Sequence, residues 1–185
     1  MLDIALIHYP VYNKNREIIG SAVTNLDLHD LARAGRTYGV ETVYIVTPFA
    51  DQQELVREIV SHWQEGHGAL YNKDRKEALT VIEICTDLEE LFERVTSARQ
   101  GRPTILATCA AEQKKTIGFQ DVRDGVAAKE NYLLLFGTAW GFTEEVFAMV
   151  DGSLPPIRGA GDYNHLSVRS AVAIILDRIL GSRDL

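Results

Sequence analysis

The chain has 185 residues, with a hydrophobic content of 46% and a charged content of 24%, which is typical of a folded globular domain rather than a disordered segment. Its formal net charge of −7 argues against non-specific binding of polyanions over the whole surface. No stretch approaches the roughly 20 apolar residues of a membrane helix, and the first residues do not resemble a secretory leader. We therefore expect one cytoplasmic domain over residues 1–185, outside any membrane.

Short apolar runs alternate with amphipathic stretches, which predicts an α/β fold with a mostly parallel sheet and helices on both faces. Strands are predicted at residues 3–8, 42–46, 80–85, 103–108 and 131–136, with a last short strand at 156–158. Helices are predicted at residues 52–63, 87–98, 143–150 and 167–180, and from Thr24 or Asn25 to Gly39. Residues 10–20 and 66–78 are predicted to be polar loops, and no element is assigned to the long segment ending at Gly125.

The cysteines and histidines do not indicate a metal site. Cys85 and Cys109 each follow an apolar run and are expected to pack as reduced thiols, because two cysteines form neither a disulfide framework nor a zinc cluster. His62 and His67 are five residues apart and would lie on different helix faces. His8 ends the first strand and could face a site or serve only the structure.

Two basic groups lie outside the strands. Lys114, Lys115, Arg123 and Lys129 form one, and Lys73, Arg75 and Lys76 form the other. Both are consistent with solvated loop charges, although a local basic patch could still contact RNA on an acidic protein. The predicted C-terminal helix carries a wide apolar stripe, of which one part would cover the sheet and the remainder would form a subunit contact.

The most informative segment is Gly137-Thr138-Ala139-Trp140-Gly141, directly after a buried strand. Its glycines allow the backbone to approach a ligand closely, and Trp140 could pack on a ring or fill the core. A second glycine-containing segment, residues 155–161, precedes a helix start near Ser167, where free amides favour a carboxylate or ribose hydroxyls. We expect the two segments to form one pocket.

Together these segments resemble the SPOUT class of knotted RNA methyltransferases. Residues 25–46 are similar to its first motif, an asparagine followed by an arginine-bearing helix and a strand. Residues 136–142 are similar to the second motif, and residues 154–157 with 166–176 to the third. The small predicted bacterial RNA methyltransferases of this class are the most similar group.

The resemblance implies a deep C-terminal trefoil knot, S-adenosyl-L-methionine as cofactor, tRNA or rRNA as substrate, and a homodimer formed through the C-terminal helix and the knot. It implies no metal. The implied cofactor-binding residues are Ala107, Thr108, Phe136, Gly137, Thr138, Trp140, Gly141, Ile157, Gly159, Leu166, Ser167 and Val168. The candidate catalytic residues are Arg33, Asn164 and His165, because methyl transfer needs an oriented acceptor and, for some acceptors, a base.

The motifs also depart from the class. Thr138-Ala139-Trp140 stands where one branch has a glutamate, and Ser167 stands where that branch has an asparagine. Residues 161–165 instead resemble the guanine-N1 branch, so the base that would be methylated is left open. Two other functions remain as alternatives: a regulatory α/β module that binds S-adenosylmethionine or a nucleotide without catalysis, and an unrelated hydrolase or nucleotide-binding enzyme.

Overall fold

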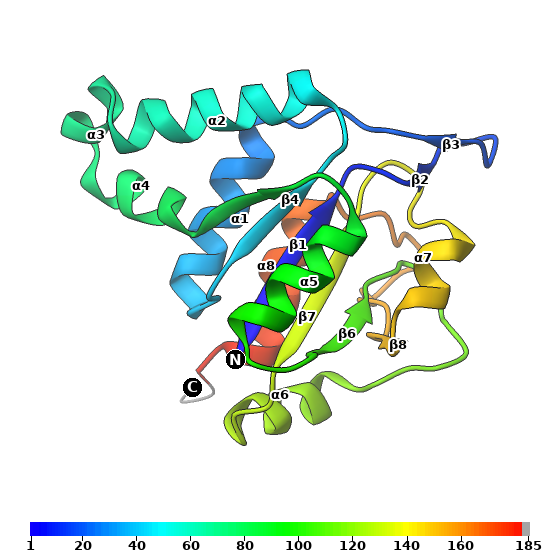
Figure 1. Cartoon of the computed structure of the whole chain (residues 1–185). Helices are drawn as coiled ribbons and strands as arrows, with labels where there is room; N and C mark the ends of the chain where they lie inside the picture. Colours follow the sequence, from blue (N-terminus) through cyan, green and yellow to red (C-terminus); the bar gives the residue numbers. More distant parts are fainter. Residues whose placement is uncertain (183–185) are drawn as a thin grey trace.

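The computed structural model describes residues 1–182 and is built on one six-stranded sheet in which every neighbouring pair is parallel (Figure 1). The strands, in order across the sheet, are β5 (Ile82–Cys85), β4 (Val43–Val46), β1 (Leu2–Ile7), β7 (Tyr132–Gly137), β6 (Thr104–Ala107) and β8 (Gly152–Ser153). A short antiparallel hairpin, β2 (Val11–Tyr12) and β3 (Ile18–Ile19), follows β1. The predicted parallel sheet is confirmed.

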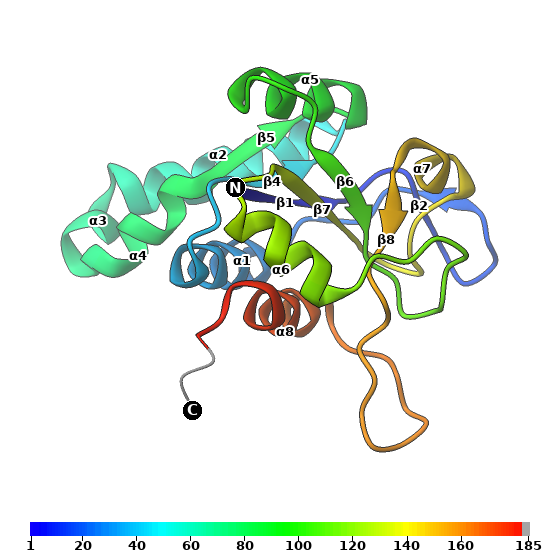
Figure 2. The same cartoon turned by 90° about the horizontal axis from the view of Figure 1, so that it is seen from below.

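Helices cover both faces of the sheet, as predicted (Figure 2). One face carries α1 (Asn25–Tyr38), α2 (Ala50–Gln64), α6 (Phe119–Ala127) and α8 (Val168–Leu180), and the other carries α5 (Leu88–Ala98) and α7 (Glu144–Met149). The side chains of the central strand β1 alternate between the two cores: Leu2, Ile4 and Leu6 pack in the core with α1 and α8, whereas Ala5 and Ile7 pack in the core with α5. Parallel strands buried on both faces have such continuous apolar sequences.

The helix boundaries follow local capping signals. The Thr24 hydroxyl accepts a hydrogen bond from the Asp27 amide at 3.2 Å, and Gly39 ends α1 in the left-handed conformation with φ +74°. At the start of α8, the Ser167 hydroxyl accepts from the Ser170 amide at 3.3 Å. These sequence-predicted helix ends are confirmed.

Three predictions of local structure were wrong, and one helix was not predicted. Residues 10–20, predicted to be a polar loop, contain the β2–β3 hairpin, because Tyr12 pairs through its main chain with Trp140 and Gly141 far away in the sequence. Residues 66–78 form α3 (His67–Tyr71) and α4 (Lys73–Ala78), followed by a 3₁₀ turn at Leu79–Val81, because Trp63 packs against Gly68 and holds this segment on α2. Helix α6 lies in the segment to which no element was assigned. The last strand is β8 rather than residues 156–158, since Pro156 has no amide proton for a strand ladder.

Arg123 is not a solvated loop charge. From α6 it donates hydrogen bonds to the carbonyls of Arg178, Ile179 and Gly181, at 3.2, 3.3 and 2.5 Å. These carbonyls end α8 and have no partners within the helix, so a cation here satisfies them and opposes the negative end of the helix dipole. Arg123 therefore fastens the end of α8 to α6.

Within residues 1–182, no helix combines the length and apolar character needed to cross a membrane.

Candidate functional site

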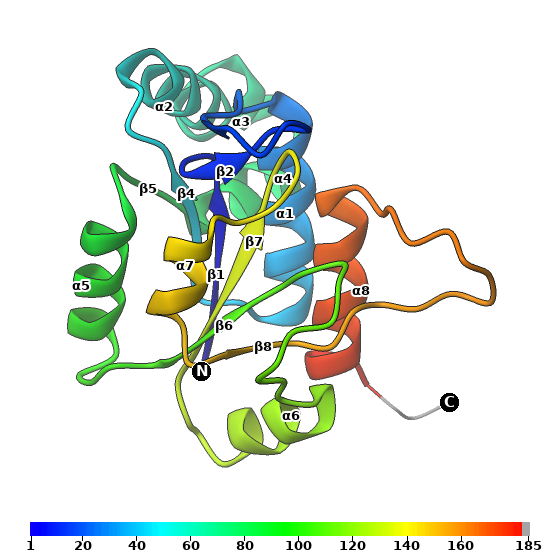
Figure 3. The same cartoon turned by 90° about the vertical axis from the view of Figure 1, so that its right-hand side faces the viewer.

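The strands β1, β7, β6 and β8 end at the same edge of the sheet because they run parallel (Figure 3). In open α/β sheets, ligands bind in crevices outside these carboxyl ends. Three segments leave the edge: the turn at residues 137–141, the chain after β6, and the long loop between β8 and α8. The predicted pocket residues lie on these segments or at their ends.

The turn after β7 is held by the β2 strand. The Trp140 amide donates to the Tyr12 carbonyl, and the Tyr12 amide donates to the Gly141 carbonyl, both at 2.9 Å. Gly141 has φ +93°, a conformation that L side chains rarely adopt, and Ala139 has φ +50°. The Trp140 side chain is 67% exposed, so it does not fill the core.

The long loop contacts the end of β6 and the chain that follows it. Leu154 donates its amide to the Ala107 carbonyl at 2.9 Å, and the Asn164 side-chain amide donates to the Ala110 carbonyl at 2.7 Å. Arg158 forms an ion pair with Glu112 at 2.6 Å, with both side chains exposed. Figures 2 and 3 show the middle of the loop extending away from the body of the protein.

This loop offers main-chain donors. None of the backbone amides of residues 157–167 donates a hydrogen bond to a residue that the structure describes. Free amides on a loop that leaves the carboxyl edge of the sheet suit a ligand with several acceptor atoms, such as an adenosine with its ribose hydroxyls. The donor set at this edge therefore fits an adenosine-containing cofactor.

A partly buried hydrogen-bond chain joins the turn to the end of β1. The Thr138 hydroxyl donates to the Ile7 carbonyl at 3.0 Å and lies 2.6 Å from the Ser21 hydroxyl, which in turn lies 2.8 Å from His8 Nδ1. Since a carbonyl only accepts, Thr138 uses its single proton on Ile7, and Ser21 must donate to Thr138. His8 must then donate to Ser21, which assigns the proton of the neutral imidazole to Nδ1.

His8 is buried, and its Nε2 atom has no partner among the described residues. Burial lowers the pKa of His8 from 6.5 to about 4, and the Asp27 carboxylate opposes this shift only in part. The ring is therefore neutral at pH 7 and keeps a lone pair on Nε2. The sequence left the role of His8 open, and nothing in the local pattern indicated Ser21.

The other predicted residues divide into groups. Ala107 and Phe136 have fully buried side chains within the two cores, so only their main chain could reach a ligand. The remaining predicted cofactor-binding residues are half-buried or exposed at the carboxyl edge or on the late loop: Thr108, Gly137, Thr138, Trp140, Gly141, Ile157, Gly159, Leu166, Ser167 and Val168.

The candidate catalytic residues do not converge within this chain. His165 is exposed on the late loop with its ring 5.4 Å from that of Tyr163, and Asn164 is held by Ala110. Arg33 is exposed on α1, and its guanidinium forms no ion pair with any residue that the structure describes. The structure brings Asn164 and His165 to the late loop but leaves Arg33 apart from them.

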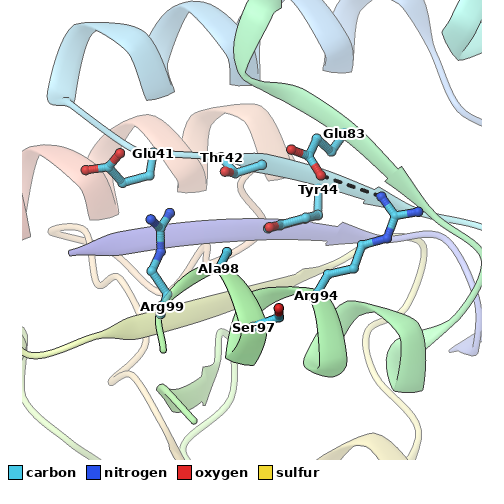
Figure 4. Close-up of a pocket in the computed structure, with 8 residues that line it drawn as sticks. All are labelled: Glu41, Thr42, Tyr44, Glu83, Arg94, Ser97, Ala98 and Arg99. Carbon is cyan, nitrogen blue, oxygen red and sulfur yellow. Dashed lines mark ion pairs between the residues drawn. The ribbon is translucent and has the colours of Figure 1, made fainter. Parts of the chain in front are cut away.

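A cavity of 460 Å³ lies elsewhere, between α5 and the strands β4 and β5 (Figure 4). Its wall includes Thr42, directly before β4, which places the cavity toward the amino ends of the strands. Both of its arginines are already paired: Arg94 lies 3.6 Å from Glu83, and Arg99 donates two hydrogen bonds to the buried Asp3 at 2.8 and 2.6 Å. These pairs attach α5 to the sheet, so we assign this cavity no ligand. The described residues contain no group of three or more potential metal ligands.

The fold and the edge geometry define an α/β protein with an open parallel sheet and a candidate ligand site at its carboxyl edge. Residues 1–181 match the family model of SAM-dependent RNA methyltransferases, and the chain belongs to that family. The resemblance to the SPOUT class is thereby confirmed, and the unrelated hydrolase is ruled out.

Individual relatives agree with the family. The chain is 44% identical over 180 residues to a tRNA (guanine-N(1)-)-methyltransferase of Oleidesulfovibrio alaskensis, covering 97% of this chain but 42% of that protein. It is 37% identical over 177 residues to an uncharacterized protein of Aquifex aeolicus, covering 95% of this chain and 86% of the relative. The structure of the A. aeolicus TrmH/SpoU tRNA modifying enzyme is similar in fold, with a TM-score of 0.55, 16% identity, and coverage of 97% of this chain and 73% of that one. The chain thus spans less than half the length of the first of these relatives.

Proposed function

We propose that the protein binds S-adenosyl-L-methionine at the carboxyl edge of its sheet and transfers the methyl group to a tRNA. The observation that carries this proposal is the set of main-chain amides on residues 157–167 that have no hydrogen-bond partner among residues 1–182, on a loop that leaves the same sheet edge as the Gly137–Gly141 turn, in a member of an RNA methyltransferase family. The choice of tRNA is supported by the name of the O. alaskensis relative.

The cofactor, when bound, supplies a methyl group already activated on its sulfonium, so the protein mainly positions the acceptor. In this proposal the main chain of the turn and the late loop holds the adenosine, with Trp140 packing against it. Asn164 keeps the loop in place through Ala110, and His165 lies at the loop surface where it can meet the RNA. Arg33 binds a phosphate, for which its planar guanidinium is suited.

The proposal also includes a homodimer, a trefoil knot in the C-terminal half, and a single domain over residues 1–185 working in the cytoplasm. Support for the dimer comes from exposed apolar side chains on the late loop and turn: Trp140 is 67%, Tyr163 80% and Leu166 47% exposed. Burying such a surface against a second copy is favourable. Sedimentation equilibrium measures the mass directly, and a monomer at all concentrations would contradict the dimer.

Calorimetry with S-adenosylhomocysteine tests the cofactor site. We expect binding to the unaltered protein and about fivefold weaker binding to Trp140→Ala, because aromatic packing on a ring contributes about 1 kcal/mol. Tyr71→Ala removes another exposed aromatic ring, one that lies far from the edge, and is the matched control. No binding to the unaltered protein at high micromolar ligand would contradict the proposal.

Methyl transfer is tested with tritiated S-adenosylmethionine and tRNA from cells that lack the gene. Mass spectrometry of the nucleosides then identifies the methylated atom, including whether it is guanine N1. The regulatory alternative predicts tight S-adenosylhomocysteine binding with no methyl transfer to either tRNA or rRNA. The two experiments together therefore distinguish an RNA methyltransferase from a regulatory module without catalysis.

A further inference from the structure

A basic and aromatic surface lies on α1, the end of α2 and α4, which Figure 1 shows well away from β6 and β8. We call it the α1–α4 patch; its members are Arg33, Arg36, Trp63, Lys73, Arg75 and Lys76. The α1 and α4 helices are in contact, and Arg36 donates to the Glu77 carboxylate at 3.1 and 2.6 Å. Residues from three helices therefore form one surface.

The centre of the patch is a stacked arginine. The Arg75 guanidinium carbon lies 4.5 Å from the centre of the Trp63 ring, and the His29 ring meets the same indole edge-on at 5.4 Å. A guanidinium held over a ring loses little freedom when its free N–H groups bind a phosphate. The stack thus presents a pre-oriented cation to solvent.

Most positive charges of the patch have no ion-pair partner among the described residues, the exception being Arg36, which pairs with Glu77. Most described arginines form ion pairs, but none of Arg33, Lys73, Arg75 and Lys76 forms one with a described residue. Nearby acidic groups are partly engaged, since Asp30 lies 3.7 Å from Arg169.

The local field is consistent with these unpaired charges. The pKa of His29 is lowered first by burial and then by the positive charge of Arg75; the Asp30 carboxylate opposes this shift, and Arg33 adds a smaller lowering effect. A surface with this field stands out on a protein of net charge −7.

We infer that the α1–α4 patch binds the phosphate backbone of the RNA substrate at a distance from the nucleotide that is modified. Binding of RNA to such a surface is favoured because Lys and Arg side chains that neutralise the phosphates release the counterions bound there. Helix α1 starts at the carboxyl edge of the sheet. Arg33 lies eight residues further along the helix, about 12 Å from its start. An RNA lying along α1 would therefore run from the candidate cofactor site to Arg75. This inference rests on the proposed function and extends it to the path of the RNA.

The test measures binding of a fluorescein-labelled, unmodified tRNA transcript by anisotropy between 50 and 200 mM salt. Arg75→Gln and the double change Lys73→Gln/Lys76→Gln should each weaken binding about fivefold or more at low salt and reduce the salt slope by about one for each lost phosphate contact. Arg57→Gln is the matched control, since Arg57 is exposed on α2 and paired with Glu54 at 3.2 Å. S-adenosylhomocysteine affinity should stay the same in all variants.

The outcomes are separable. Unchanged RNA affinity and slope in both patch variants, with tight RNA binding by the unaltered protein, would overturn the patch and leave the proposed function standing. An unaltered protein that binds no tRNA would overturn both. Arg75→Lys keeps the charge and should therefore keep the salt slope, so it distinguishes a loss of charge from a loss of folding. A thermal unfolding curve for each variant checks independently that the variant is folded.

Discussion

The hydroxyl oxygens of Ser21 and Thr138 lie 2.6 Å apart although 117 residues separate them in sequence. This contact joins the chain after the β2–β3 hairpin to the start of the turn that carries Trp140. Because His8 donates to Ser21 and Thr138 donates to Ile7, the ends of β1 and β7 are joined by side chains as well as by the strand ladder. The shape of the candidate cofactor site therefore depends on a residue outside all the motifs.

Ser21→Ala should destabilise the protein by about 1–3 kcal/mol, because it leaves the buried Nδ1–H of His8 without an acceptor. It should also weaken S-adenosylhomocysteine binding by loosening Thr138. Urea unfolding and calorimetry measure the two effects. Ser61→Ala, on the exposed surface of α2, is the control, and equal stability of the two variants would contradict the assigned hydrogen-bond chain.

Stability should fall in mild acid because of His8. Its pKa of about 4 in the folded protein lies below the ordinary value of 6.5, so as the pH falls the unfolded chain takes up the proton first. The contribution is complete above pH 6.5 and is lost between pH 6.5 and 4. From pH 7 to pH 5 this amounts to about 2 kcal/mol.

Urea unfolding at pH 7 and pH 5 checks this prediction for the unaltered protein and for His8→Gln. The difference between the two pH values should shrink by about 2 kcal/mol in His8→Gln, whatever the variant's stability at pH 7. His67→Gln, which replaces an exposed histidine, is the control and should behave as the unaltered protein. An identical pH response in His8→Gln would show that His8 is not the group responsible.

Gly141→Ala should destabilise the protein by about 1–3 kcal/mol, because φ +93° is unfavourable for any residue with a Cβ. No neighbouring atom lies within 4 Å of the added carbon, so the cost comes from the backbone alone. Gly101→Ala also meets no atom within 4 Å, has no positive φ, and is the control. Thermal unfolding compares them, and a neutral Gly141→Ala would mean that the turn adopts another conformation.

Arg123→Met should destabilise the protein by about 1–2 kcal/mol, because the last carbonyls of α8 lose their donor. Hydrogen exchange should show the added opening concentrated at the end of α8, around Ile179. Lys129→Met removes an exposed charge from the chain just after α6 and is the comparison. Equal protection of the Ile179 amide from hydrogen exchange in the two variants would argue against the role assigned to Arg123.

Local sequence pattern was enough to predict the parallel sheet and most helix ends. A strand buried on both faces is an unbroken apolar run, as in β7, and a cap such as Thr24 acts on an amide only three residues away. The resemblance of residues 136–142 and 154–176 to known motifs was likewise visible without a structure. Helix α3 was missed because its packing depends on Trp63, which belongs to another helix and is not visible in the local sequence of α3.

Contacts between distant parts of the chain decided the rest. Three contacts join residues whose spacing in the sequence follows no helix or strand period. His8 forms a hydrogen-bond chain with Ser21 and Thr138. Arg123 donates to the last carbonyls of α8, and Arg75 stacks on Trp63. Composition and spacing established which residues could form strands, helices and a glycine turn. Only folding determined which polar groups are buried together, because burial and hydrogen bonding arise when elements pack and not along the chain.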